Sequence, residues 1–220
     1  MIYICIFDFE ITSYETNDYH EVIEITSILY EWDGNYNFIS DFQEFCKPKN
    51  RPKLCNYCKY ITGILQEDVN NALPFNQVLK KHYKWLLDNC DISNVYFVTY
   101  GTFPLSNMAL FEYNNYKMTQ QQKSQVSENS TQNIQDLQCD DGFYTIKVPE
   151  IYFKFIDIKY EFSQFYNTKI YRMKSMLKKL NIKYYKRNEN YNSININNLL
   201  KKMIVDGLEF DDMDIIKIIL

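Results

Sequence analysis

The stretch Tyr3-Ile4-Cys5-Ile6-Phe7-Asp8-Phe9-Glu10-Ile11-Thr12 decides how this chain folds. Its short, continuous apolar run predicts a buried β-strand. Side chains two positions apart lie on the same face of a strand, so Asp8 and Glu10 should converge near its carboxyl end. Two adjacent carboxylates repel each other unless they share a proton or a cation. The pattern therefore predicts a site for Mg²⁺ or Mn²⁺, with acids that merely face water as the alternative.

The composition is that of a globular protein, because 46% of its 220 residues are hydrophobic and 17% are aromatic. A net charge of −4 and a pI near 5.3 do not favour nucleic-acid binding by bulk electrostatics. Such binding would need a local basic patch or a metal. No run of apolar residues is long enough to span a membrane, and the chain begins directly with strand sequence. We expect a soluble intracellular protein, in the cytoplasm or nucleus, without membrane insertion.

The cysteines favour reduced thiols over a metal cluster. Cys5 falls in the predicted buried strand, where a thiol behaves as a small hydrophobic group. Cys55-x-x-Cys58, with Cys46 upstream, could supply half of a zinc site. A complete site needs a fourth ligand, and no second Cys or His pair provides one. We therefore expect no zinc.

The order of the predicted elements indicates an α/β fold. Three strands joined by short connections come first, followed by a helix, a further strand and then mainly helices. Such an order is typical of a mixed sheet packed between helices, in which sites lie at the carboxyl ends of the strands. After the first strand, the expected strands cover residues 22–30, 36–46 and 95–100, and the expected helical or amphipathic segments cover 74–87, 105–113, 150–166, 172–180 and 195–206.

Residues 118–142 differ sharply from the rest of the chain. They are rich in Gln, Ser, Asn and Asp and carry few apolar side chains. A segment of this composition cannot bury enough surface to order itself. The pattern of strands and helices resumes after it, so we expect residues 1–220 to form a single domain with a low-complexity insertion at about 118–142.

Several motifs resemble those of one enzyme family. They are the Asp8-Phe9-Glu10 strand, the run His20-Glu21-Val-Ile-Glu24, and the block Ile61-Thr62-Gly63-Ile64-x-Gln66. In this order they resemble the DEDDh 3′-5′ exonucleases, specifically the branch that holds the 3′ histone-mRNA exonuclease and the enhancer of RNAi. The resemblance implies a ribonuclease H-like (DEDD exonuclease) fold, with a mixed central sheet flanked by helices. It also implies two-metal phosphodiester hydrolysis, in which four carboxylates hold two divalent ions and a histidine acts as general base.

The resemblance assigns the first two catalytic acids to Asp8 and Glu10. The third acid of the family follows a strand, a glycine and an aromatic residue. In this chain Gly101 follows the expected strand, the aromatic position is Phe103, and Pro104 stands where the acid would be. Proline has no side-chain ligand for a metal ion.

The third motif of the family pairs a histidine with an aspartate five residues later. When Asn198 anchors the alignment, these positions fall on Asn190 and Asn195. A slip of one residue places Tyr191 and Ile196 there instead, so neither alignment restores the histidine or the aspartate. Two carboxylates then face two divalent ions, where the family supplies four, and any Mg²⁺ or Mn²⁺ at Asp8 and Glu10 should bind weakly.

These replacements favour a catalytically degenerate exonuclease, a pseudo-exonuclease that serves as an RNA-binding or protein-interaction subunit of a larger assembly. The alternative is an active metal-dependent 3′-5′ exoribonuclease that trims structured or small RNA 3′ ends with an altered site. Candidate RNA contacts are Phe9, Thr12 and Phe103, and the two aromatic rings could equally be core. The basic stretch 169–187 is either the solvated face of a helix or a phosphate-contacting rim.

Overall fold

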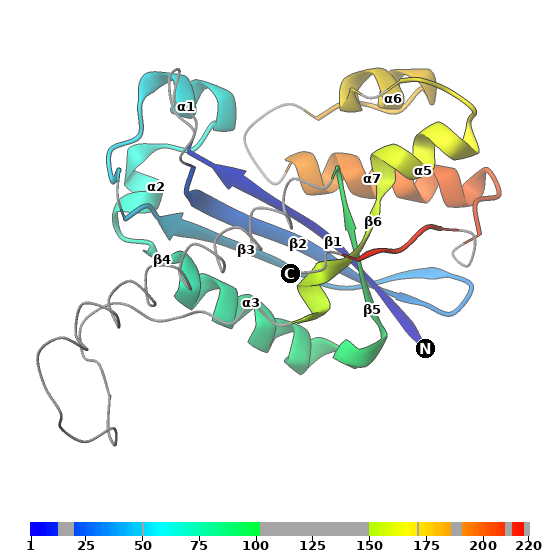
Figure 1. Cartoon of the computed structure of the whole chain (residues 1–220), viewed down its shortest axis with the longest axis horizontal. Helices are drawn as coiled ribbons and strands as arrows, with labels where there is room; N and C mark the ends of the chain where they lie inside the picture. Colours follow the sequence, from blue (N-terminus) through cyan, green and yellow to red (C-terminus); the bar gives the residue numbers. More distant parts are fainter. Residues whose placement is uncertain are drawn as a thin grey trace, which may run out of the picture.

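Seven strands form one sheet in the part of the chain that the computed structural model describes, which is residues 1–12, 20–49, 51–101, 150–170, 172–185, 191–209 and 213–217. The strand order is β4-β3-β2-β1-β5-β6-β7, and β1 stands at the centre (Figure 1). Their bounds are β1 (Ile2–Ile11), β2 (Val22–Trp32), β3 (Tyr36–Lys47), β4 (Leu73–Pro74), β5 (Val95–Thr99), β6 (Lys154–Asp157) and β7 (Ile216–Lys217).

The sheet is mixed, as the sequence predicts. Strand β1 pairs antiparallel with β2 and parallel with β5, and β5 in turn pairs parallel with β6. The hairpin between β2 and β3 turns at Gly34, whose φ of 97° is a left-handed conformation that glycine adopts without strain. In the register of β1 and β2, Asp8 lies opposite Thr26 and Glu10 lies opposite Glu24.

Helices cover both faces of this sheet. Helix α3 (Phe75–Asn89) packs on one face, and α7 (Tyr191–Val205) packs on the other with α5 (Ile158–Phe165) and α6 (Met173–Lys179) beside it (Figure 1). The remaining helical elements are α1 (Asn56–Thr62), α2 (Gln66–Asn70), η1 (Ile92–Asn94) and η2 (Glu150–Phe153). The helix expected at 105–113 and the insertion at 118–142 lie outside the described residues.

Two expected segments differ from the observed elements. The segment 150–166 forms a 3₁₀ turn, strand β6 and helix α5 rather than one amphipathic element. The division falls at Asp157, whose carboxylate accepts a hydrogen bond from the Lys159 backbone nitrogen and so caps α5. Helix α7 begins at Tyr191, four residues before its expected start, because tertiary contacts of its first turn add to a weak local preference.

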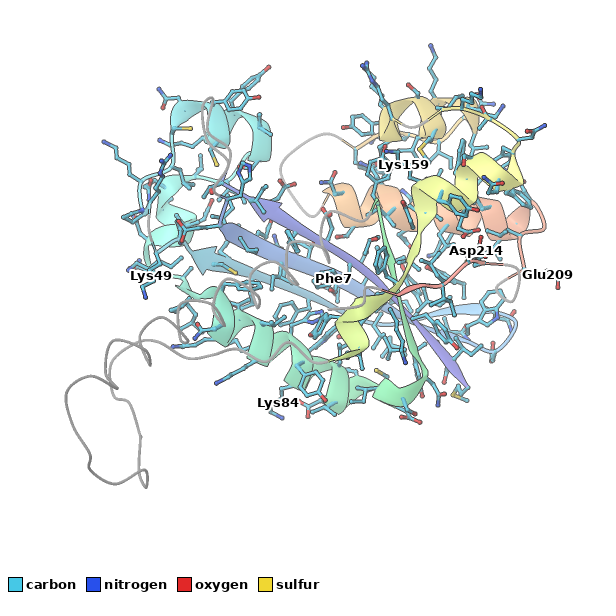
Figure 2. The ribbon with its side chains drawn as sticks, viewed as in Figure 1. Phe7, Lys49, Lys84, Lys159, Glu209 and Asp214 are labelled. Atoms are coloured by element: carbon cyan, nitrogen blue, oxygen red, sulfur yellow. The ribbon has the colours of Figure 1, made fainter. Side chains whose placement is uncertain are left out.

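The alternation of side chains along β1 divides the core into two layers. Cys5, Phe7 and Phe9 pack in the layer under α3, while Ile4 and Ile6 pack in the layer under α7. Figure 2 shows Phe7 in the middle of the sheet. Because the period of a strand is two residues, Asp8 and Glu10 continue the row of Ile4 and Ile6.

The layer under α3 contains a buried polar network. His82 Nε2 lies 2.7 Å from the Ser27 hydroxyl, and His82 Nδ1 lies 2.7 Å from the Tyr152 hydroxyl. All three side chains are buried, so their hydrogen bonds replace the water that they lose on folding. No helix in the described ranges is long and apolar enough to cross a membrane.

Candidate functional site

Two carboxylates meet α7 at the carboxyl end of β1. The Asp8 side chain is 9% exposed and that of Glu10 is half-buried. Both lie on the α7 face of the sheet by strand alternation, as the sequence predicts. Their neighbours across β2 include Glu24, which is buried and accepts a hydrogen bond of 2.7 Å from Gln43 Nε2. The end of β1 therefore concentrates negative charge in a place with little water.

The side chain that faces these carboxylates from α7 is Asn192. Its Nδ2 donates a hydrogen bond of 3.1 Å to Glu10 Oε1, and its amide also hydrogen-bonds the Asp8 carboxylate. The next residue of α7, Ser193, bonds the Thr26 hydroxyl directly opposite Asp8. The first turn of α7 is thus fixed against the ends of β1 and β2. The amide of Asn192 therefore lies where an acidic side chain from α7 would otherwise meet Asp8 and Glu10.

Burial sets the protonation of Asp8. Removal from water raises the pKa of this carboxyl group to about 7, while hydrogen bonds from Asn192 and from the Phe9 backbone lower it and the charge of Glu24 raises it further. Burial likewise raises the pKa of Glu24, partly offset by its bond from Gln43. A proton therefore occupies Asp8 for much of the time near neutral pH, where a bound cation would favour the charged form.

The third-motif alignment places Asn195 at the position of the fourth acid, but its side chain hydrogen-bonds the backbone of Tyr185. Its side chain is 0% exposed; Nδ2 donates to the Tyr185 carbonyl at 2.9 Å, and Oδ1 accepts from the Tyr185 nitrogen at 3.0 Å. Both ends of the amide are engaged in holding the chain before α7. Among the described side chains of α7, Asn192, three residues earlier, reaches the acids, and the sequence alone did not single it out. Pro104, Phe103 and Asn190 lie outside the described residues.

The two remaining candidate contacts from β1 are buried. Phe9 is 6% exposed and lies on the α3 face, edge-on to Phe7 with ring centroids 6.1 Å apart. This is the core alternative that its sequence pattern left open. The hydroxyl of Thr12 accepts a hydrogen bond of 2.9 Å from the Glu21 nitrogen, which joins the end of β1 to the start of β2. Phe9 thus packs behind the carboxylates, and Thr12 ties together the ends of the two strands.

The oxygen donors at this place suit one hard cation better than two. Asp8 and Glu10 supply two negative charges, and Asn192 could add a neutral carbonyl oxygen after rotation of its amide. Within the described ranges, no group of three or more His, Cys, Asp or Glu side chains could hold a metal ion. The Cys55 thiol accepts a hydrogen bond of 3.3 Å from the Cys58 backbone nitrogen at the start of α1.

Comparison with known proteins agrees with this geometry. The RNase_T exonuclease family model matches residues 5–187, which is most of the chain. The chain belongs to this exonuclease family. The family resemblance expected from the motifs is therefore confirmed, and the exonucleases of the DEDDh group normally use divalent metal ions.

The curated relatives of this exonuclease-family chain include 3′-5′ exoribonuclease 1 of Rattus norvegicus and of Homo sapiens. Each is 38% identical over 87 residues, a region that is 38% of this chain and 25% of the relative. The 3′-5′ exonuclease eri1 of Schizosaccharomyces pombe is 31% identical over 93 residues, which is 41% of this chain and 31% of that protein. The matched region is thus a quarter to a third of the length of these relatives.

Solved structures confirm the α/β ribonuclease H-like fold. The nuclease domain of 3′hExo, described as a DEDDh family member bound to rAMP, superposes with a TM-score of 0.72 at 24% identity. The match covers 99% of this chain and 97% of that domain. A second solved structure shows a 3′-exonuclease that recognises the 3′ end of a histone mRNA stem-loop. It superposes with a TM-score of 0.67 at 25% identity, over 99% of this chain and 71% of that one.

Proposed function

We propose that this exonuclease-family domain binds the 3′ end of RNA without hydrolysing it, as a catalytically degenerate subunit of a larger assembly. The observation that carries the proposal is the Asn192 amide, which donates to Glu10 and contacts Asp8. A hydrogen-bond donor stabilises a neighbouring carboxylate without a metal ion. A third carboxylate at this place would instead repel Asp8 and Glu10 unless a metal ion bound between them. The Asn192 donor, together with the proton that burial keeps on Asp8 for much of the time near neutral pH, supports a site that persists without a cation pair.

The sequence around Asn192 supports the same proposal. If Asn192 occupies the place of the fourth acid, the histidine of the third motif falls five residues earlier, on Arg187. Arginine stays protonated at physiological pH and cannot accept a proton from water. The third acid falls on Pro104, as before. Two carboxylates and no general base remain from the five groups that two-metal hydrolysis uses.

RNA is the proposed ligand because of what the relatives do. The relatives are named as exoribonucleases, and one structural neighbour recognises the 3′ end of a histone mRNA stem-loop. Binding and hydrolysis depend on different groups, because bases and phosphates can be held by aromatic and cationic side chains that take no part in proton transfer. Protein partners of such a subunit remain a prediction from the sequence.

The survival of Asp8 and Glu10 favours a second function, an active exoribonuclease with an altered site. A single Mg²⁺ or Mn²⁺ on these acids would polarise the scissile phosphate, and Asp8 and Glu10 would be the residues that hold it. The residues that orient RNA would be unchanged. This function requires a proton acceptor for the attacking water, and the described side chains near Asp8 supply none other than the carboxylates themselves.

The deciding experiment incubates the pure chain with 3′-hydroxyl single-stranded and stem-loop RNA in Mg²⁺ and in Mn²⁺. We expect binding in a filter or anisotropy assay and no shortening of the RNA on a sequencing gel. An Asp8→Asn, Glu10→Gln variant is the control for contaminating nucleases. Shortening that this variant loses would establish the active enzyme, and failure of the wild type to bind either RNA would contradict both functions.

A further inference from the structure

Positive charge is concentrated in one segment of this acidic chain. Residues 169–187 contain eight Lys and Arg side chains and no Asp or Glu. The rest of the chain contains sixteen basic and 28 acidic residues, so the net charge of −4 hides two regions of opposite sign. A local patch of this kind meets the requirement for polyanion binding that the total charge does not.

The cations of this segment that the structure describes are exposed, and none forms an ion pair with another described residue. Elsewhere, lysines pair with carboxylates, as in Lys81 with Glu44, Lys84 with Asp88, and Lys202 with Asp206. No such pair with a described carboxylate includes a cation of the segment. The exposed cations define the basic surface, and they are Lys169, Arg172, Lys174, Lys178, Lys179 and Lys183.

The basic surface is the outer side of α6 and of the residues that flank it. Met176 and Leu177 turn inward and pack in the core layer under α7, so the charged side chains of α6 face outward. Figure 1 shows α6 beside α5 and α7, on the side of the sheet away from α3. Figure 2 shows Lys159, from the start of α5, on the same side of the molecule.

Tyr185, the last described residue of the segment, lies beside α7. Asn195 holds the Tyr185 backbone through two hydrogen bonds. Asn192, which contacts the carboxylates, lies on the same face of α7 three residues earlier, about 4.5 Å away along the helix axis. A chain that enters at Asp8 and Glu10 would therefore pass close to Tyr185 as it leaves along the basic surface.

Tyr185 gives this route an exposed aromatic ring. Its side chain is 38% exposed, and Lys183 Nζ lies 4.7 Å from the ring centroid. Rings interleaved with cations are the usual features of surfaces that bind single-stranded nucleic acid, because bases stack while cations contact the phosphates. A solvated helix face would more often carry acids among its cations, and here it carries none.

We propose that the basic surface binds the phosphates of single-stranded RNA upstream of the 3′ end, through direct cation contacts that need no metal ion. The proposal rests on the proposed function, in which the RNA 3′ end lies at Asp8 and Glu10. Direct contacts from lysine and arginine replace the part of the binding that a metal pair would otherwise supply to the phosphate backbone. An acidic protein segment would lack the bases that stack on Tyr185.

The test compares two variants with the same change of charge. One is Arg172→Gln, Lys174→Gln, Lys178→Gln on the basic surface, and the control is Lys80→Gln, Lys81→Gln, Lys84→Gln on α3, on the opposite side of the sheet (Figure 2). The affinity of each for a labelled twelve-nucleotide single-stranded RNA is measured by anisotropy over a series of salt concentrations, in EDTA.

For the basic-surface variant we expect a loss of affinity of about tenfold or more near physiological salt. Its slope of log affinity against log salt should be smaller than that of the wild type by about 2, because each lost contact removes about 0.7. The control should keep the slope and affinity of the wild type. If the first variant does not fold, Lys169→Gln, Lys179→Gln, Lys183→Gln provides a second sample of the same surface.

Three outcomes would contradict the proposal in distinguishable ways. An unchanged slope in the basic-surface variant, with normal binding by the wild type, overturns the inference and leaves the proposed function intact. No RNA binding by the wild type overturns the proposed function. Displacement of RNA by polyglutamate at an equal concentration of charge indicates an acidic protein partner, and it also overturns the inference.

Discussion

The substitution Asn192→Asp tests whether this amide stands where a metal-binding acid would stand. It removes the hydrogen bond of 3.1 Å to Glu10 Oε1 and places a third carboxylate beside Asp8 and Glu10. Two charges about 4 Å apart repel by about 4 kcal/mol at an effective dielectric constant of 20. Because Glu10 and Asn192 are half-buried, screening lowers this, and we expect a loss of about 2 kcal/mol in the free energy of unfolding in EDTA.

The same carboxylate should improve metal binding. It adds a full negative charge to a site that offers two, and a hard divalent ion prefers a carboxylate to a neutral amide oxygen. A gain of about 1.4 to 2.8 kcal/mol corresponds to a ten- to hundredfold increase in Mn²⁺ affinity. The variant should therefore unfold about 4 to 8 °C below the wild type in EDTA, and Mn²⁺ should remove most of this difference.

Titration calorimetry with Mn²⁺ and thermal unfolding in EDTA and in Mn²⁺ measure these two effects. Asn195→Asp is the matched control, because it introduces the same charge three residues away, where the amide holds Tyr185. We expect it to destabilise the fold in both conditions without a gain in Mn²⁺ affinity. An affinity of Asn192→Asp within twofold of the wild type would refute the reasoning, and a gain in Asn195→Asp would favour the alignment that the sequence suggests.

Three further predictions concern pH and packing. Burial lowers the pKa of His82 to about 3, so the unfolded state takes up a proton first as pH falls below 6.5, and urea unfolding should show a loss of about 3 kcal/mol by pH 4 that His82→Gln reduces. The pH dependence from Asp8 has the opposite sign, because burial raises its folded pKa to about 7. Its contribution to the free energy of unfolding is complete below pH 3.8 and is lost as pH rises through 7, so urea unfolding should show Asp8→Asn stabilising the metal-free chain by up to about 4 kcal/mol at pH 8. Asn195→Ala leaves both backbone groups of Tyr185 without this partner, and denaturant unfolding should show a loss of about 1 to 3 kcal/mol.

The sequence predicts the sheet and its charged end well because these depend on short-range patterns. An apolar run followed by Asp8 and Glu10 can be buried on both faces only as a central strand, and that strand is β1. Alternation by two then requires both acids to lie on one face, whichever helix covers it. The helix that covers it is separated from them by more than 180 residues, so its contacts depend on tertiary packing.

The contact from α7 could not be predicted because the chain repeats one residue type there. Asparagine occurs at 188, 190, 192, 195, 197 and 198, so several alignments of the third motif place an asparagine at the position of the acid. Only the packing of α7 on β1 and β2 distinguishes Asn192 from its neighbours. The division of residues 150–166 into a strand and a helix, in contrast, could have been predicted. Asp157 is a good N-cap residue before Ile158, and this local signal marks the start of α5.

Under the proposed function, the two asparagines of α7 would explain how the fold stays intact with few catalytic groups. A cation pair in an exonuclease site holds acids together that would otherwise repel. Here the Asn192 amide and a proton on Asp8 offset that repulsion, while Asn195 fixes the Tyr185 backbone beside the basic surface. On this proposal, the end of β1 would stay folded without a metal ion. An RNA 3′ end at this place would be held by groups outside it, which is why the salt dependence of binding, rather than its metal dependence, should distinguish this chain from a hydrolytic relative.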